Sequence, residues 1–163
     1  MDLSTIVTSI SAASVVTGTI IAILQLRNFV KNRQAQLFME LYNKFLDPDF
    51  RKKEDSIFLA QWKDYDDWYI KYGPVVNPEM FYTLNSIMTF FEGIGVLAEK
   101  KLIEIDLIDN LMGPSIRDTW EKMGPLVKEL RKRTGYRVAY EWTEYLYKTI
   151  VEYESKRGLT KEK

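Results

Sequence analysis

The chain has 163 residues, and its 23 lysines and arginines balance 23 aspartates and glutamates, so no net charge favours a nucleic-acid partner. It contains no histidine and no cysteine, which excludes disulfides, thiolate nucleophiles and nearly every zinc or haem site. We therefore expect no cofactor and no bound metal.

The first long segment, residues 3–26, carries no charged side chain, although eight of its 24 residues are serine or threonine. As a helix it rises roughly 36 Å, more than the ~30 Å hydrocarbon thickness of a bilayer. Its eleven Leu, Ile and Val residues favour insertion by roughly 3 to 7 kcal/mol before the hydroxyl groups are counted. Residues 1–26 are therefore predicted to form a transmembrane helix, with a buried core helix or a cleaved signal peptide as the alternatives.

Positive charge follows this segment at Arg27, Lys31 and Arg33, whereas only Asp2 precedes it. A signal peptide has positive charge before its apolar region, so this order disfavours one. Lysines and arginines next to a span stay preferentially on the cytoplasmic side. The sequence thus predicts a single-pass protein of the cell membrane with its N-terminus outside and its C-terminal domain in the cytoplasm.

Small and polar residues follow one side of the predicted membrane helix at steps of three and four. We name four of them, Ser11, Ser14, Gly18 and Ala22, the small-residue stripe. Such a stripe lets helices approach closely in lipid, so these residues are candidates for a membrane helix interface. In the alternative interpretation, the hydroxyl groups simply bond to the backbone of their own helix.

The helical pattern continues beyond the membrane segment without an interrupting glycine or proline. One continuous helix is therefore predicted from Ser4 to Leu46, with residues 27–46 as a stalk. It ends at this point because Pro48 disfavours helical geometry at Asp47.

Residues 47–157 are predicted to form a cytoplasmic helical domain, so the fold class is all-α: one transmembrane helix that continues into a bundle of about four to five helices. No alternating run of β-branched residues occurs here, which excludes strands. The final residues, 158–163, are predicted to be a flexible tail. The expected helices cover 49–72, 77–101, 106–112, 114–134 and 137–157, with Asn77 as an N-cap and Gly113 and Pro114 as a break.

Glu92 interrupts the most apolar of these helices, and a lone buried carboxylate would cost several kcal/mol. We expect it to pair with Arg117, either as a structural ion pair or as a site with a perturbed carboxylate. Glu99, Asp106 and Asp109 could join it in a carboxylate cluster. Helical bundles that bind metals through such clusters use Glu-x-x-His pairs, however, and this chain has no histidine.

The block from Phe90 to Arg131, together with the N-terminal span and the corner "LDPDFR", resembles domain of unknown function 4760, a family of short membrane-anchored helical proteins in prokaryotes. The marks that carry the resemblance are Glu92, Gly93, Gly95, Asp106, Arg117 and Trp120. "IEID" stands here where the family has a turn with two aspartates. The resemblance implies the architecture and no particular activity.

We expect an interaction protein and not an enzyme: an accessory subunit or adaptor that lies in membrane lipid and docks on a larger membrane protein complex. Its aromatic-rich helices suit a protein partner. The first alternative is a scaffold or sensor that self-associates through its span as a homo-oligomer. The second is an enzyme or small-ligand binder that uses Glu92 and Arg117.

Overall fold

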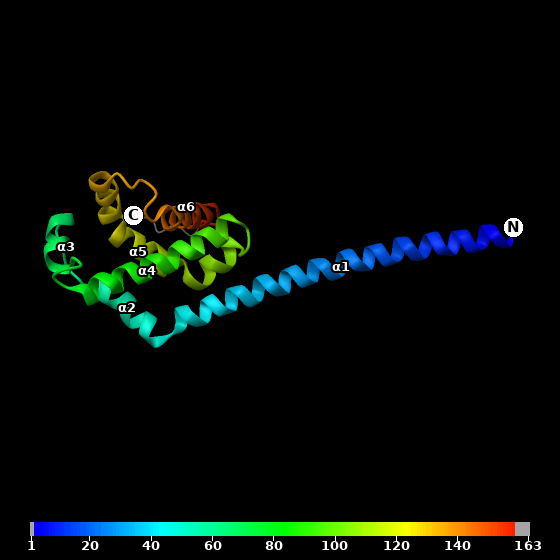
Figure 1. The fold of residues 1–163 in the computed structure, drawn as a ribbon, viewed down its shortest axis with the longest axis horizontal. Coiled ribbons are helices and arrows are strands. Elements are labelled where there is room, and N and C mark those ends of the chain that lie inside the picture. The colour runs from blue at the N-terminus through cyan, green and yellow to red at the C-terminus, as the bar shows by residue number, and fades with distance from the viewer. Residues whose placement is uncertain (1, 159–163) are drawn as a thin grey trace. The chain divides into compact units, whose positions relative to one another are not determined.

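The computed structural model describes residues 2–158, and in that range it contains helices and no strand, which confirms the all-α class (Figure 1). The contacts divide the chain into two compact units, one up to Glu40 and one from Leu41 onward. The predicted tail lies outside the described residues, apart from Gly158. The helices are α1 (Leu3–Leu46), α2 (Pro48–Leu59), α3 (Tyr65–Tyr72), α4 (Pro78–Glu99), α5 (Ile105–Thr134) and α6 (Glu141–Lys156).

Helix α1 is continuous over 44 residues, which confirms the single long helix predicted from Ser4 to Leu46. Its apolar stretch has a mean hydropathy of 1.4, and none of that stretch is buried. By length and composition it can cross a bilayer. Helix α4 passes the same test of length and composition, but a third of its apolar stretch is buried, as in the core helix of a folded domain.

Local signals set several helix ends. Asp47 caps α2, because its side chain accepts a hydrogen bond of 2.8 Å from the N–H of Asp49. Asn77 caps α4 by accepting a bond of 3.0 Å from the N–H of Met80. Gly135 ends α5 with a left-handed φ of 72°, a conformation that glycine adopts without strain.

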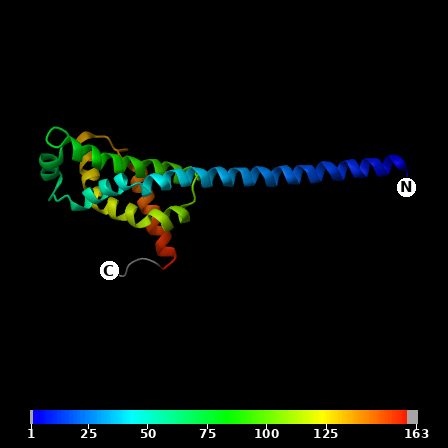
Figure 2. The same ribbon diagram turned by 90° about the horizontal axis from the view of Figure 1, so that it is seen from below.

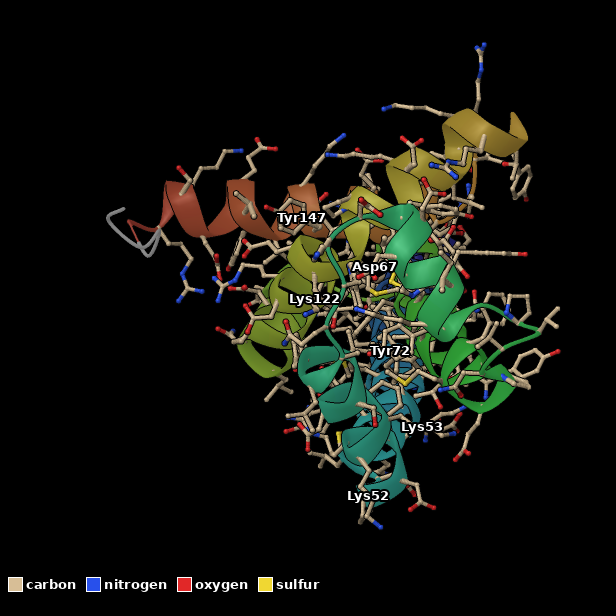
Figure 3. The ribbon with its side chains drawn as sticks, turned by 90° about the vertical axis from the view of Figure 1, so that its left-hand side faces the viewer. Lys52, Lys53, Asp67, Tyr72, Lys122 and Tyr147 are labelled. Atoms are coloured by element: carbon tan, nitrogen blue, oxygen red, sulfur yellow. The ribbon has the colours of Figure 1, made fainter. Side chains whose placement is uncertain are left out.

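The single helix predicted over 49–72 is wrong, because the structure has α2 and α3 with an extended link between them. Ala60 leaves the helix in an extended conformation, and its carbonyl accepts a bond of 2.8 Å from Nζ of Lys122 in α5 (Figure 3). Asp64 then caps α3 by accepting from the N–H of Asp67 at 2.9 Å. A cap and a bond from a distant helix replace the helical bonds of this segment.

The break predicted at Gly113 and Pro114 is also wrong, since α5 runs through both residues. A proline inside a helix costs about 3 kcal/mol. The face that contains Ile108, Met112 and Ile116 is at most 1% exposed, and full burial of each such side chain stabilises by about 1.5–3 kcal/mol. Burial of this continuous face outweighs the lost hydrogen bond.

Helix α6 packs against both α4 and α5, and α2 and α3 pack against the same two helices (Figures 1 and 2). Helix α4 supplies more of the fully buried side chains of this unit than any other helix. Its core side chains, each at most 1% exposed, are Leu84, Ile87, Met88, Phe91 and Ile94. Helix α4 is therefore the central element against which the other four helices of the unit are positioned.

The glycines of α4 differ in their surroundings. A Cβ at Gly95 would lie 2.2 Å from the carbonyl oxygen of Trp142, so the backbones of α4 and α6 meet there. Gly95 is therefore a position of close packing between the two helices. A Cβ at Gly93 would meet no atom within 4 Å, so Gly93 is not a packing position.

Candidate functional site

Glu92 lies at the start of α6, where its carboxylate accepts three hydrogen bonds. The N–H of Thr143 donates at 2.7 Å, its hydroxyl donates at 2.8 Å, and the N–H of Trp142 donates at 3.3 Å. The two N–H groups belong to the first turn of α6, where N–H groups have no partner inside their own helix. The side chain of Tyr140, the N-cap residue of α6, accepts no hydrogen bond from an N–H group of this helix. Glu92 therefore caps α6 from a neighbouring helix.

Arg117 of α5 pairs with Glu154 of α6, and both carboxylate oxygens of Glu154 accept from the same Nη1 atom. Glu154 is 8% exposed and the nearby Asp109 is 7% exposed. Arg157 adds a second cation, with its Nη1 at 3.6 Å from Oδ2 of Asp109. We call these four residues the charged cluster.

Burial raises the pKa of Asp109 above its ordinary value, and the Glu154 carboxylate beside it raises that pKa further. Arg157 and Arg117 act in the opposite direction, because a positive charge favours the ionised carboxylate. Two acids and two arginines of this kind balance in charge. The charged cluster thus joins α5 to α6.

The predicted pair of Glu92 and Arg117 is corrected by these contacts. Among the described residues, each of the two has its own partner, Thr143 for Glu92 and Glu154 for Arg117. The suggested carboxylate cluster is corrected as well: the described residues contain no group of three His, Cys, Asp or Glu that could hold a metal ion. Glu92 serves a helix end because the free N–H groups of α6 need an acceptor, which Tyr140 does not provide.

Two buried acids, Glu54 and Glu154, are not among the predicted site residues, although the periodicity of the sequence indicates both. Glu154 follows Leu146 and Ile150 at four-residue steps, which places it on the core face of α6. Glu54 of α2 likewise follows Phe50 at a step of four and is only 2% exposed. An acidic residue in register with a buried stripe is the signal that identifies such a position.

Glu54 is paired with Arg51 across 2.5 Å, while its Oε1 atom has no hydrogen-bond partner among the described residues. Burial raises its pKa above the ordinary value of 4.5, and Ser115 and Arg51 lower it only in part. The ionised form of Glu54 is therefore poorly supported by its surroundings.

The small-residue stripe lies on α1, and its members Ser11, Ser14, Gly18 and Ala22 are all exposed. A Cβ at Gly18 would meet nothing within 4 Å. Two neighbouring hydroxyl groups bond to their own helix: Thr8 donates to the Ser4 carbonyl and Thr19 to the Val15 carbonyl, each at 2.8 Å. Their polarity is thus satisfied inside α1, which makes a serine- and threonine-rich helix compatible with lipid.

The pattern that defines one family matches the chain over residues 12–150, from within α1 to α6. This protein belongs to the family described as Domain of unknown function (DUF4760). The resemblance stated for Phe90 to Arg131 is thereby confirmed, and it extends well beyond that block. No curated protein and no solved structure matches this DUF4760 chain.

Replacing Glu92 with alanine is expected to lower the free energy of unfolding by about 2 kcal/mol, since it removes a helix cap and leaves Thr143 without its acceptor. Glu92→Gln keeps one acceptor oxygen and is expected to cost about half as much. Urea unfolding followed by tryptophan fluorescence measures both, because every tryptophan lies between residues 62 and 142. Glu141→Ala, an exposed acid in the first turn of α6, is the control and should cost only about 0.5 kcal/mol. Equal losses for Glu92 and Glu141 would contradict a specific cap.

The raised pKa of Glu54 makes stability depend on pH. In the folded state this carboxyl binds its proton more tightly than in the unfolded chain, so its contribution is fully present below about pH 4.5 and is lost as pH rises through the folded-state pKa. Glu54→Gln removes this dependence, so the stability of the variant relative to the native chain should increase from pH 5 to pH 8. Unfolding free energies across that range measure it, and the exposed Glu121→Gln should leave the native profile unchanged. A difference that does not change with pH would exclude the raised pKa.

Proposed function

We propose that this protein is a membrane-anchored interaction protein, in which α1 spans the cell membrane once and the domain of residues 47–157 docks on a larger membrane protein complex from the cytoplasmic side. The observation that supports this is the apolar surface of α1. All its residues from 11 to 33 are exposed.

An exposed surface of this kind is unfavourable in water. Val15 is 69% exposed, Val16 is 59% exposed and Leu26 is 64% exposed, and other valines, isoleucines and leucines of α1 are similar. Burial of such a side chain stabilises a protein by about 1.5–3 kcal/mol. In water, each exposed apolar side chain of α1 would lack this stabilisation. Lipid covers every side of a single helix at once, and a helix satisfies its own backbone groups in lipid.

The charges at the end of the apolar stretch support the orientation. Arg27, Lys31 and Arg33 follow it within two turns, and all three are exposed. Such residues remain on the cytoplasmic side of a membrane. The domain that follows them along the chain then also lies in the cytoplasm.

A second exposed apolar surface, in the last turn of α3 and the connection that follows it, supports a protein partner. Ile70 is 70% exposed, Val75 is 89% exposed and Val76 is 65% exposed. We call these three residues the 70–76 turn. Neighbouring apolar side chains at such exposure are typical of an interaction site. A partner that covers them would bury a compact apolar patch next to the tyrosines of α3.

The contacts of Glu92 and Arg117 favour this proposal over an enzyme. The Glu92 carboxylate accepts hydrogen bonds at the start of α6, and the Arg117 guanidinium pairs with Glu154. A catalytic carboxylate must reach a substrate, and these bonds engage both oxygens of Glu92.

Self-association through α1 is the second candidate function, and the small-residue stripe favours it. Its four members are exposed on one side of α1, with open space at Gly18. Helices with such a side approach one another closely in lipid, where packing drives association. A homo-oligomer formed this way would act as a scaffold or sensor.

The topology has a direct test. A tag after Lys163 is expected to resist protease added outside intact cells and to be digested once the cells are opened, while the chain stays with the membrane after alkaline washing. The positive-inside preference gives this direction. Cleavage of the tag on intact cells would show that the domain lies outside and would contradict the proposed orientation. Release of the chain by the wash would contradict a transmembrane helix.

The two candidate functions differ in the mass of the purified particle. Extraction in mild detergent followed by light scattering is expected to give a complex of this chain with a second protein. The variant Val76→Asp, which places a charge in the 70–76 turn, should release the second protein because it would leave a charge buried without a partner. Self-association predicts instead a homo-oligomer that Ala22→Ile disrupts. Ala13→Ile, on the opposite side of α1, is the matched control. A lone monomer would contradict both.

A further inference from the structure

A cavity of about 320 Å³ lies among α3, α4 and α5, in the unit that begins at Leu41. Ligand sites in proteins occupy roughly 300–1,000 Å³, so it has room for one small molecule. Its wall is mostly apolar. Five aromatic residues from different segments contribute to it: Tyr65, Trp68, Tyr69, Phe81 and Tyr140. The methionines Met88 and Met123 add polarizable surface beside these rings.

The wall of this cavity includes no aspartate, glutamate, lysine or arginine among the described residues. A charged group placed inside would lose its hydration without meeting a counter-ion, which costs several kcal/mol. A neutral molecule avoids this cost. Aromatic rings in the wall favour a flat aromatic molecule over a flexible chain, because ring pairs gain energy beyond the apolar area that they bury.

Two polar side chains of the wall are paired within the fold. Tyr140 donates to Oδ1 of Asn85 at 2.6 Å, and Nδ2 of Asn85 donates to the Phe81 carbonyl at 2.7 Å. Their hydrogen-bonding groups therefore do not require a polar ligand.

The backbone of the cavity wall is strained at Tyr140. Its φ is 53°, in the left-handed region that bulky residues rarely adopt. Such a conformation costs of order 1–3 kcal/mol and is found mainly where the surrounding structure fixes it, often at ligand sites. Here it belongs to a residue that both precedes α6 and forms part of the cavity wall.

We propose that this cavity, which we call the aromatic cavity, binds a neutral aromatic small molecule. The volume, the uncharged wall and the aromatic rings of that wall carry the proposal. It goes beyond a role in protein docking, because it assigns the domain a small-molecule ligand.

Benzophenone has this chemistry and reports its own position, since its excited carbonyl inserts into nearby C–H bonds and methionine is a favourable target. The full-length chain in lipid nanodiscs, irradiated with benzophenone, is expected to become labelled at Met88 or Met123. Peptide mass spectrometry separates these sites from labelling of α1 by probe dissolved in the lipid. The charged analogue 4-benzoylbenzoate should not label either methionine.

A matched pair of variants tests the location. Leu130 and Leu97 are both half-buried leucines, but Leu130 lines the aromatic cavity and Leu97 lies in a separate groove beside α4. Leu130→Trp fills the cavity and is expected to abolish labelling of the two methionines, whereas Leu97→Trp should leave it intact. Unfolding curves of both variants show whether each retains its fold. Labelling that survives in a folded Leu130→Trp chain would overturn the proposal.

The assay measures the cavity alone, so a chain found to be water-soluble would be labelled in buffer by the same criterion.

Discussion

The domain depends on a carboxylate of one helix that caps the start of another helix. Helix α6 begins at a residue that provides no cap, and Glu92 of α4 accepts the N–H groups of its first turn instead. One turn further along α4, Gly95 lets the two backbones meet. A charge at the positive end of a helix dipole and a close backbone contact thus act at the same place. They fix where α6 starts and which side of α4 it lies on.

The charged cluster does the same at the other end of α6. Arg117 and Arg157 reach back from opposite helices to Glu154 and Asp109, whose carboxylates are nearly buried. Buried ion pairs add little net stability, because desolvation offsets their attraction. Their value here is directional: α6 meets its partners in one register, since any other register would leave a buried charge unpaired. Both ends of α6 are therefore specified by charges, while the middle is held by apolar packing.

These roles change where function is sought. The residues that look chemically active in the sequence are engaged in holding helices together. Among the described residues, the large exposed apolar surfaces are elsewhere, on α1 and at the 70–76 turn. Aromatic residues also divide into two groups. Rings at the start of α2 pack tightly, with the Phe50 and Phe90 centroids 4.6 Å apart, whereas the rings from α3 surround empty space. The second group is the one available to a ligand.

The sequence by itself determined that the chain is helical, several of the helix ends and the apolar character of α1. Caps such as Asp47 and Asn77, and the glycine at 135, act on groups only a few residues away, so their effect can be read without knowing the fold. The family could be identified for a related reason, since its marks lie within one continuous block. Only the tertiary structure decided which charges meet. Glu92 bonds to Thr143, which lies 51 residues further along the chain, and Arg117 pairs with Glu154, which lies 37 residues further along. Periodicity shows that such residues face a core, but it does not show which helix lies opposite. The same limit explains the continuous α5, where burial against other helices overrides the local effect of Pro114.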